Sequence, residues 1–136
     1  MNVLIDTNVL LSAALRDRLP EQVVRYVAAA DDCRWIVTEE IVREYVGVIK
    51  RPRFGLSPQL LQEWAELISL RTVMVASPPV QIEFPRDPKD AIFLSAALSA
   101  GADYLISGGN DLLQCRVGIA TRIVSVAEFA GEFGLV

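Results

Sequence analysis

The stretch NVLIDTNVLLSAAL, residues 2–15, decides how the rest of this chain is organised. Residues 3–5 form a short apolar run without alternation, which is typical of a strand buried on both faces of a sheet. Short polar residues follow, and an apolar pattern that suits a short helix resumes at Val9. Asp6 therefore stands at the carboxyl end of the predicted first strand, where open α/β sheets bind their ligands. The alternative is that Asp6 or Thr7 only caps the next helix.

The composition is that of one folded domain, which we assign to residues 1–136. The chain has 136 residues, of which 52% are hydrophobic, and its mean hydropathy is +0.36, far from a disordered composition. No apolar run reaches the roughly 18 residues of a spanning helix, and the N-terminus lacks the basic leader of a secretory signal. We therefore expect a cytoplasmic protein without a membrane partner.

The residue types in the sequence restrict the chemistry that is available. The sequence contains no histidine, which excludes Ser-His and Cys-His nucleophiles and imidazole acid–base catalysis. Cys33 and Cys115 form no CxxC pair, so no zinc site is indicated. Carboxylates remain, and they favour Mg²⁺ or Mn²⁺ over soft metals. The net charge of −4 argues against binding nucleic acid by bulk charge alone, but it permits a local basic rim.

Apolar runs alternate with helical stripes along the whole chain, without repeats or an interdomain linker. This alternation predicts a parallel sheet with helices on both faces, joined by right-handed crossovers. After the first strand, we predict strands within residues 35–37, 72–76, 103–107 and 119–124, and helices over residues 20–30, 39–50, 57–70 and 91–100 and from residue 126 onward.

Glu44 lies on the apolar stripe of its predicted helix or at the margin of that stripe, between Ile41 and Val48. A carboxylate there must be paired, bound to a metal or shifted in pKa, because an unpaired buried charge is costly. We interpret Glu44 as functional if Asp6 is functional. The alternative is that Glu44 pairs with a lysine or arginine at the helix edge.

The same helix ends in the basic residues Lys50, Arg51 and Arg53, followed by Phe54. Cations at a helix C-terminus complement the helix dipole, and this is the simpler explanation. The alternative is a rim that faces phosphate, in which Arg51 and Arg53 bind the backbone of a nucleic acid.

A second pair of acids opens the helix at residues 91–100. Asp87 fits the N-cap of this helix, and Asp90 would complete a capping box in which Asp replaces Glu or Gln. Against that explanation, Asp90 precedes Phe93 and Leu94 on a helix that is apolar almost all round, so Asp90 would face the sheet. We interpret Asp90 as functional and Asp87 as structural.

These acids converge if the parallel sheet forms. Asp6, Glu44 and Asp90 would meet at the carboxyl edge of the central strands, close to the turn at residues 107–111. Asp111 in that turn either caps it or points into the site. Several carboxylates repel one another unless a cation lies among them, and a divalent ion would also bind phosphate and lower the pKa of a water. The implied reaction is metal-assisted phosphodiester hydrolysis.

Four segments, taken in their order and spacing, resemble a PIN-domain protein. They are VLIDTN (residues 3–8), EEIVREYVGVIKRPRF (39–54), DPKDAIFLSAALSAGADYLIS (87–107) and SGGNDLL (107–113). The resemblance runs from residue 2 to about residue 129 and is strongest to VapC-type toxins of toxin–antitoxin pairs. It implies a three-layer α/β/α sandwich with a central, mainly parallel sheet of roughly four or five strands. It also implies a ribonuclease that depends on Mg²⁺ or Mn²⁺.

The resemblance also implies roles for individual residues, with one departure from the family pattern. The metal-binding and catalytic acids fall on Asp6, Glu44 and Asp90, and the small polar supporting residues fall on Asn8 and Ser107. Family members commonly read Gly-Asp-x-Asp after the fourth strand, but here Gly109 stands at the first Asp of that pattern. Asp111 is retained and could replace it, directly or through water, so a one-metal or weakened enzyme is expected.

Two hypotheses follow. The first is an endoribonuclease that cuts single-stranded or looped RNA and leaves a 5′-phosphate and a 3′-hydroxyl, as the resemblance implies. It would be the toxin of a toxin–antitoxin pair, with a cognate antitoxin as partner, and it would form a homodimer. The second is a catalytically weakened or inactive PIN-like module that binds RNA or protein, and Gly109 motivates it.

Overall fold

Among the residues that the structure describes, the sheet has five strands, and all of their pairings are parallel. The computed structural model describes residues 1–78, 88–114 and 120–135. The strands are β1 (Asn2–Ile5), β2 (Arg34–Val37), β3 (Thr72–Met74), β4 (Tyr104–Ile106) and β5 (Arg122–Val124). Their order across the sheet is β3-β2-β1-β4-β5, so the first strand is the central one. Val3 pairs with Trp35 on one side and with Tyr104 on the other.

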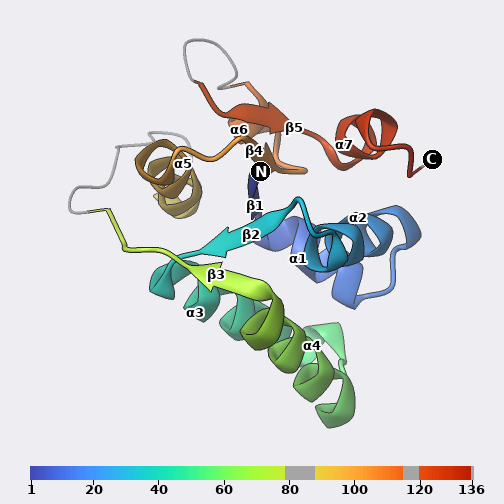
Figure 1. The fold of residues 1–136 in the computed structure, drawn as a ribbon. Coiled ribbons are helices and arrows are strands. Elements are labelled where there is room, and N and C mark those ends of the chain that lie inside the picture. Colours follow the sequence, from blue (N-terminus) through green and yellow to red (C-terminus); the bar gives the residue numbers. More distant parts are fainter. Residues whose placement is uncertain (79–87, 115–119, 136) are drawn as a thin grey trace.

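Helices cover both faces of this sheet. They are α1 (Thr7–Ala14), α2 (Arg18–Ala29), α3 (Glu39–Ile49), the 3₁₀ helix η1 (Pro52–Phe54), α4 (Pro58–Arg71), α5 (Pro88–Ala100), the short α6 (Asn110–Leu113) and α7 (Val126–Glu132). Figure 1 shows α5 on one side of the sheet and α2, with α7 beside it, on the other. The predicted α/β/α sandwich with a parallel sheet is confirmed.

The burial of β1 explains its central position. Val3, Leu4 and Ile5 are each 0% exposed, as expected for an apolar run covered on both faces. Because β1 has a strand on either side and helices above and below, no side chain of this run can reach water. Burial continues through Asp6 and Thr7, and Asn8 is the first exposed residue after the strand.

Local signals fix the starts of the helices that follow the strands. The Thr38 side chain accepts a hydrogen bond from the amide of Ile41 (3.2 Å), so α3 begins directly after β2. Ser125 and Glu128 form a complete capping box at the start of α7, directly after β5. Because these helices start where parallel strands end, their first turns lie at the carboxyl edge of the sheet.

Some predicted boundaries differ from the observed ones. Helix α2 begins at Arg18 rather than at Pro20, because proline is tolerated throughout the first helical turn, where amides lack intrahelical acceptors. Strand β3 ends at Met74 rather than at Ala76. Asp87 lies outside the described residues. Among the residues that are described, no helix is both long enough and apolar enough to cross a bilayer.

Candidate metal-binding site

A cavity of about 250 Å³ lies next to the carboxyl end of β1. Its wall combines acids, bases, small polar groups and apolar side chains, and it is lined by Asp6, Thr7, Asn8, Leu11, Glu44, Val48, Arg51, Arg53, Phe54, Asp90 and Phe93. The three carboxylates come from the junction of β1 with α1, from α3 and from the first turn of α5. The fold therefore brings together acids that are far apart in the sequence.

Asp6 is held in place by hydrogen bonds from the neighbouring strand. Its amide donates to the carbonyl of Ile106 (2.9 Å), and its carboxylate Oδ2 accepts from Ser107 Oγ (2.8 Å). Ser107 Oγ in turn accepts from the amide of Gly109 (3.0 Å). Asp6 is 4% exposed and Ser107 is fully buried. Ser107 is the predicted supporting residue; the structure shows its contact with Asp6, and its role in the site stays a prediction.

The capping interpretation of Asp6 is wrong for its side chain. Asp6 occupies the N-cap position of α1, with extended backbone angles, but its side chain makes no capping hydrogen bond. Its carbonyl accepts from the amides of Val9 (3.0 Å) and Leu10 (3.2 Å), as at any N-cap. The carboxylate instead turns toward Ser107 and the cavity. The acid is therefore placed by the sheet and is not used to start the helix.

The other predicted residues surround the same cavity. Glu44 and Asp90 are half-buried, whereas the side chain of Asn8 is exposed. Arg51 and Arg53 are exposed and also line the cavity, where they form a basic rim. The guanidinium carbon of Arg53 lies 4.9 Å from the centre of the Phe54 ring, which restricts the orientation of that arginine.

The groups at this cavity suit a hard divalent cation. Within residues 1–78, 88–114 and 120–135, no three acidic or cysteine side chains are gathered closely enough to hold a metal as they stand. Oxygen donors nevertheless face one cavity from three elements, and Mg²⁺ and Mn²⁺ prefer such donors. The hydroxyl of Thr7 is buried and has no hydrogen-bond partner among the described residues. A buried hydroxyl without a partner costs about 1–3 kcal/mol, which a polar ligand in this cavity would offset.

Gly109 occupies the position where the family pattern has an acid. A Cβ atom built there would lie 3.5 Å from Ser107 Oγ and 3.9 Å from Asp6 Oδ2, both ordinary contact distances. A carboxylate on Gly109 would therefore point into the neighbourhood of Asp6 without a steric clash. The backbone of Asp111 belongs to α6, but its side chain lies outside the described part of the chain. Its predicted contribution to catalysis stays a prediction.

Sequence reasoning missed two features of this site. The sequence indicated Thr7 only as a helix cap, although this residue lines the cavity and its buried hydroxyl has no hydrogen-bond partner among the described residues. Tyr45 was counted only as part of an apolar stripe, although its hydroxyl contacts the backbone beside Asp6. The one available signal was that each residue directly follows a predicted acid, and residues beside an acid in a chain are rarely informative.

Comparison with known proteins agrees with this architecture. The family model described as PIN domain matches residues 2–111, a span that contains β1 to β4 and every acid lining the cavity. No curated protein matches the chain significantly. PIN domains are typically nucleases that use divalent metal ions. From its fold and the extent of this match, the chain belongs to the PIN-domain family.

Proposed function

We propose that this protein is a divalent-metal-dependent endoribonuclease that cuts single-stranded or looped RNA. The observation that carries the proposal is the convergence of Asp6, Glu44 and Asp90, from three separate elements, on one cavity with a rim of arginines. Clustered carboxylates in a partly buried site cost free energy, and divalent cations are the usual partners that offset this cost. Membership of the PIN-domain family supports nuclease chemistry.

Each residue has a distinct part in this proposal. Asp6, Glu44 and Asp90 hold Mg²⁺ or Mn²⁺, Asn8 and Ser107 orient the acids, and Asp111 assists catalysis. When bound, such an ion lowers the pKa of water and stabilises negative charge on the phosphate. Hydrolysis adds water across the bond between phosphorus and the 3′ oxygen. Phosphorus gains the hydroxyl and the leaving 3′ oxygen gains the proton, so the products carry a 5′-phosphate and a 3′-hydroxyl.

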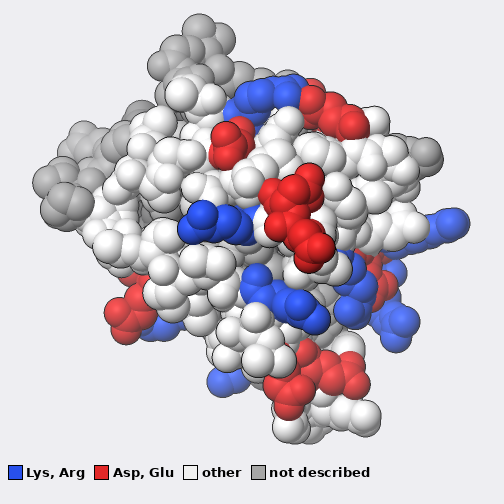
Figure 2. Space-filling view, in the orientation of Figure 1, with Lys and Arg blue, Asp and Glu red and all other residues white. Residues whose placement is uncertain are grey.

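RNA would be held by local charge, because the overall charge of −4 opposes it. Figure 2 shows acidic and basic side chains interspersed on the face that it displays. Arg51 and Arg53 are exposed beside the acids, so they can bind the phosphates that flank the scissile bond. Phe54 lies on the same wall of the cavity, and an unpaired base can stack on an aromatic ring of this kind.

The proposed biological role is that of the toxin in a toxin–antitoxin pair, which acts in the cytoplasm. An antitoxin and a second copy of the chain would both need apolar surface outside the acidic cavity. A groove of about 370 Å³ near α2 and α4 offers such surface, with Trp64, Leu67 and the 79% exposed Leu70 in or beside its wall. Arg25, Arg71, Glu63 and Glu66 also line this groove, so charges of both signs border its apolar part.

A second candidate is a weakened or inactive relative that binds RNA or protein without cutting. Gly109 favours it, because the position that faces Asp6 lacks a carboxylate. This module would bind RNA at the same arginine rim, but it would bind Mn²⁺ poorly. The two candidates therefore differ in metal affinity as well as in cleavage.

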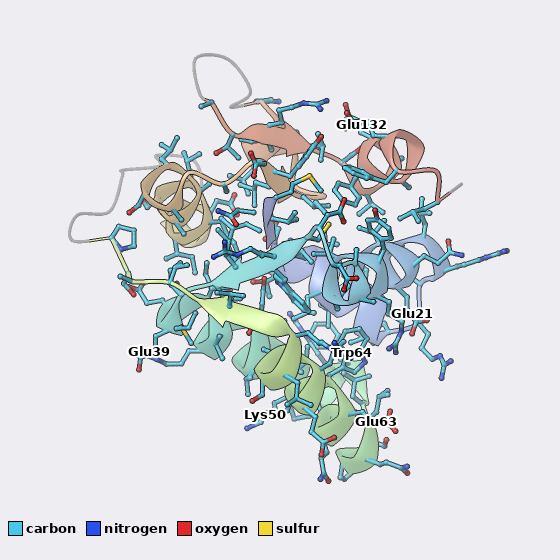
Figure 3. All side chains as sticks on the ribbon, in the orientation of Figure 1. Glu21, Glu39, Lys50, Glu63, Trp64 and Glu132 are labelled. Atoms are coloured by element: carbon cyan, nitrogen blue, oxygen red, sulfur yellow. The ribbon has the colours of Figure 1, made fainter. Side chains whose placement is uncertain are left out.

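The test compares Glu44→Gln with Glu39→Gln, the same change on the same helix. Glu39 is 75% exposed, pairs with Arg43 and points away from the body of the molecule (Figure 3). We expect Glu44→Gln to lower cleavage of a labelled single-stranded RNA in Mn²⁺ by more than about 100-fold, beyond the loss typical of an outer-shell partner. Glu39→Gln should cut like the unaltered protein.

Calorimetry with Mn²⁺ completes this test. Equal cleavage by the two variants would refute the assignment of Glu44 as a metal ligand. Binding of RNA by the unaltered protein, without cleavage and without Mn²⁺ binding, would refute the nuclease and support the binding module.

A further inference from the structure

Tyr45 connects the elements that carry the three acids. It lies on α3 directly after Glu44 and is 0% exposed. Its hydroxyl donates a hydrogen bond to the backbone carbonyl of Ile5, the residue before Asp6. The same hydroxyl oxygen accepts from Trp35 Nε1 on β2 (3.4 Å). One hydroxyl thus joins α3 to the last residue of β1 and to a residue of β2.

The ring of Tyr45 makes the third connection. It lies 6.4 Å from the ring of Phe93, with an angle of 33° between the two planes. Phe93 is fully within the core and lies on α5, three residues after Asp90 and therefore about one helical turn away. The Trp35 ring lies 6.0 Å from the Tyr45 ring. Asp6 follows Ile5, which accepts the hydrogen bond from Tyr45. Glu44 directly precedes Tyr45 in the chain. Asp90 lies about one helical turn from Phe93, whose ring contacts the ring of Tyr45.

We infer that Tyr45 is a positioning residue, whose hydroxyl and ring set the spacing of Asp6, Glu44 and Asp90. The inference deepens the proposed function, because this spacing determines how well the acids can share a cation. It assigns no contact between Tyr45 and a metal or a substrate. Tyr45 acts through the backbone of Ile5 and through the ring of Phe93.

A purely structural explanation accounts for the ring and also gives the hydroxyl a role, because the hydroxyl pairs with two buried groups, Trp35 Nε1 and the Ile5 carbonyl. A loss of stability alone would therefore not support the inference, and the readouts that do are the Mn²⁺ affinity and the separation of the acids.

The test removes only this hydroxyl and compares the result with a matched control. Tyr104→Phe removes a hydroxyl that accepts from Arg122 (3.0 Å) at the start of β4, away from the acidic cavity. We expect Tyr45→Phe to weaken Mn²⁺ binding, measured by calorimetry, by about 10-fold, as for other outer-shell partners of metal sites. Tyr104→Phe should leave the Mn²⁺ affinity unchanged.

Crystal structures of the metal-free variants give a second readout that does not depend on Mn²⁺. We expect the separation of the Asp6 and Glu44 carboxyl carbons in Tyr45→Phe to differ from the unaltered protein by more than about 0.5 Å, the tolerance of a preorganised site. Tyr104→Phe should keep the original separation. An unchanged separation together with unchanged Mn²⁺ affinity in Tyr45→Phe would overturn the inference.

A second pair of variants covers the case in which Tyr45→Phe fails to fold. Trp35 and Trp64 are both buried, at 0% and 2% exposure, but only Trp35 donates to Tyr45, whereas Trp64 lies on α4 (Figure 3). Replacing either residue by phenylalanine removes a similar volume. We expect Trp35→Phe to weaken Mn²⁺ binding by about threefold, less than a direct outer-shell partner, and Trp64→Phe to have no effect. Equal affinities in this pair would overturn the inference.

The two proposals fail in different ways. Absence of Mn²⁺ binding in the unaltered protein would refute the proposed function, and the crystallographic separation would then decide the inference on Tyr45 alone. Normal Mn²⁺ binding in Tyr45→Phe and Trp35→Phe, with an unchanged separation of the acids, would refute the inference and leave the proposed nuclease intact.

Discussion

The two ends of the central strand pair β1–β4 carry similar hydrogen bonds in different surroundings. At the amino end, the backbone N–H of Asn2 donates to Asp103 Oδ2 over 2.7 Å. At the carboxyl end, Ser107 Oγ donates to Asp6 Oδ2 over 2.8 Å. Each bond joins residues that are 101 positions apart in the chain, yet Asp103 is exposed and Asp6 is buried.

This difference separates a structural carboxylate from a candidate functional one. Asp103 keeps contact with water while it fastens the ends of two strands, so its charge is inexpensive. Asp6 is almost removed from water and shares a cavity with two further acids and two arginines, so its charge interacts with these neighbours more than with solvent. Hydrogen-bond length alone does not distinguish the two ends. Burial and the neighbouring charges do.

The largest expected effect comes from neutralising the acid at each end. We expect Asp6→Asn to reduce RNA cleavage in Mn²⁺ by more than about 100-fold, because it removes a proposed metal ligand rather than an outer-shell partner. Asp103→Asn keeps an oxygen that can accept from the Asn2 amide, so cleavage should be unchanged. Gel assays on labelled RNA measure both, with circular dichroism to verify folding. Equal cleavage by the two variants would remove the distinction between the ends.

An intermediate effect is expected from the hydroxyl that holds Asp6. Ser107→Ala removes the donor to Asp6 and the acceptor of the Gly109 amide, which should cost about 1–3 kcal/mol in the free energy of unfolding. It should also weaken Mn²⁺ binding by about 10-fold. Urea unfolding and calorimetry measure the two quantities.

The control for this change is Thr121→Val near the amino end of β5. Thr121 is buried, and its hydroxyl donates to the carbonyl of Ala102 (2.8 Å). This variant should lose stability without losing Mn²⁺ affinity. A similar loss of affinity in both variants would show that affinity only follows overall stability.

The smallest expected effect is a gain. Gly109→Asp would add a carboxylate close to Asp6, whereas Gly108→Asp adds the same charge at an exposed position with no atom within 4 Å of its Cβ. When a chelator keeps the protein free of metal, we expect Gly109→Asp to lower the Tm through repulsion between like charges. Added Mn²⁺ should reverse this loss. Mn²⁺ affinity and RNA cleavage should rise by about threefold, because affinity follows the number of charged ligands.

Thermal unfolding with and without Mn²⁺, beside the cleavage assay, measures this gain. If Gly109→Asp behaves like Gly108→Asp in all three measurements, the missing acid does not limit the site. The proposal of a weakened enzyme would then lose its basis.

Much of the fold could be predicted from short segments. The unalternating run at residues 3–5 predicted a strand buried on both faces, and each of its residues is inaccessible to water. Thr38 predicted the start of α3, and its side chain makes the capping bond. Glu44 and Asp90 were singled out because a carboxylate on an apolar helical face needs an explanation, and both line the cavity with Asp6.

Other features could not be predicted from the residues alone. The hydroxyl of Thr7 has no hydrogen-bond partner among the described residues, and this depends on which groups the folded chain brings near it. The bond from Tyr45 to the Ile5 carbonyl spans 40 positions, and its donor belongs to a stripe that predicts only helix burial. The positions of two residues in the sequence do not indicate whether a side chain and a distant backbone group will meet in the folded protein.

The sequence by itself determined the alternation of strands and helices, the caps and the kinds of donor atom that the chain can offer. These properties depend on hydrophobic periodicity and on hydrogen bonds between residues a few positions apart, which operate before any long-range contact forms. The tertiary structure alone decided that β1 lies between β2 and β4, which brings Ser107 to Asp6 and Tyr45 to the adjoining carbonyl. Strand order follows from how the whole apolar surface is buried at once, and no single segment contains that information.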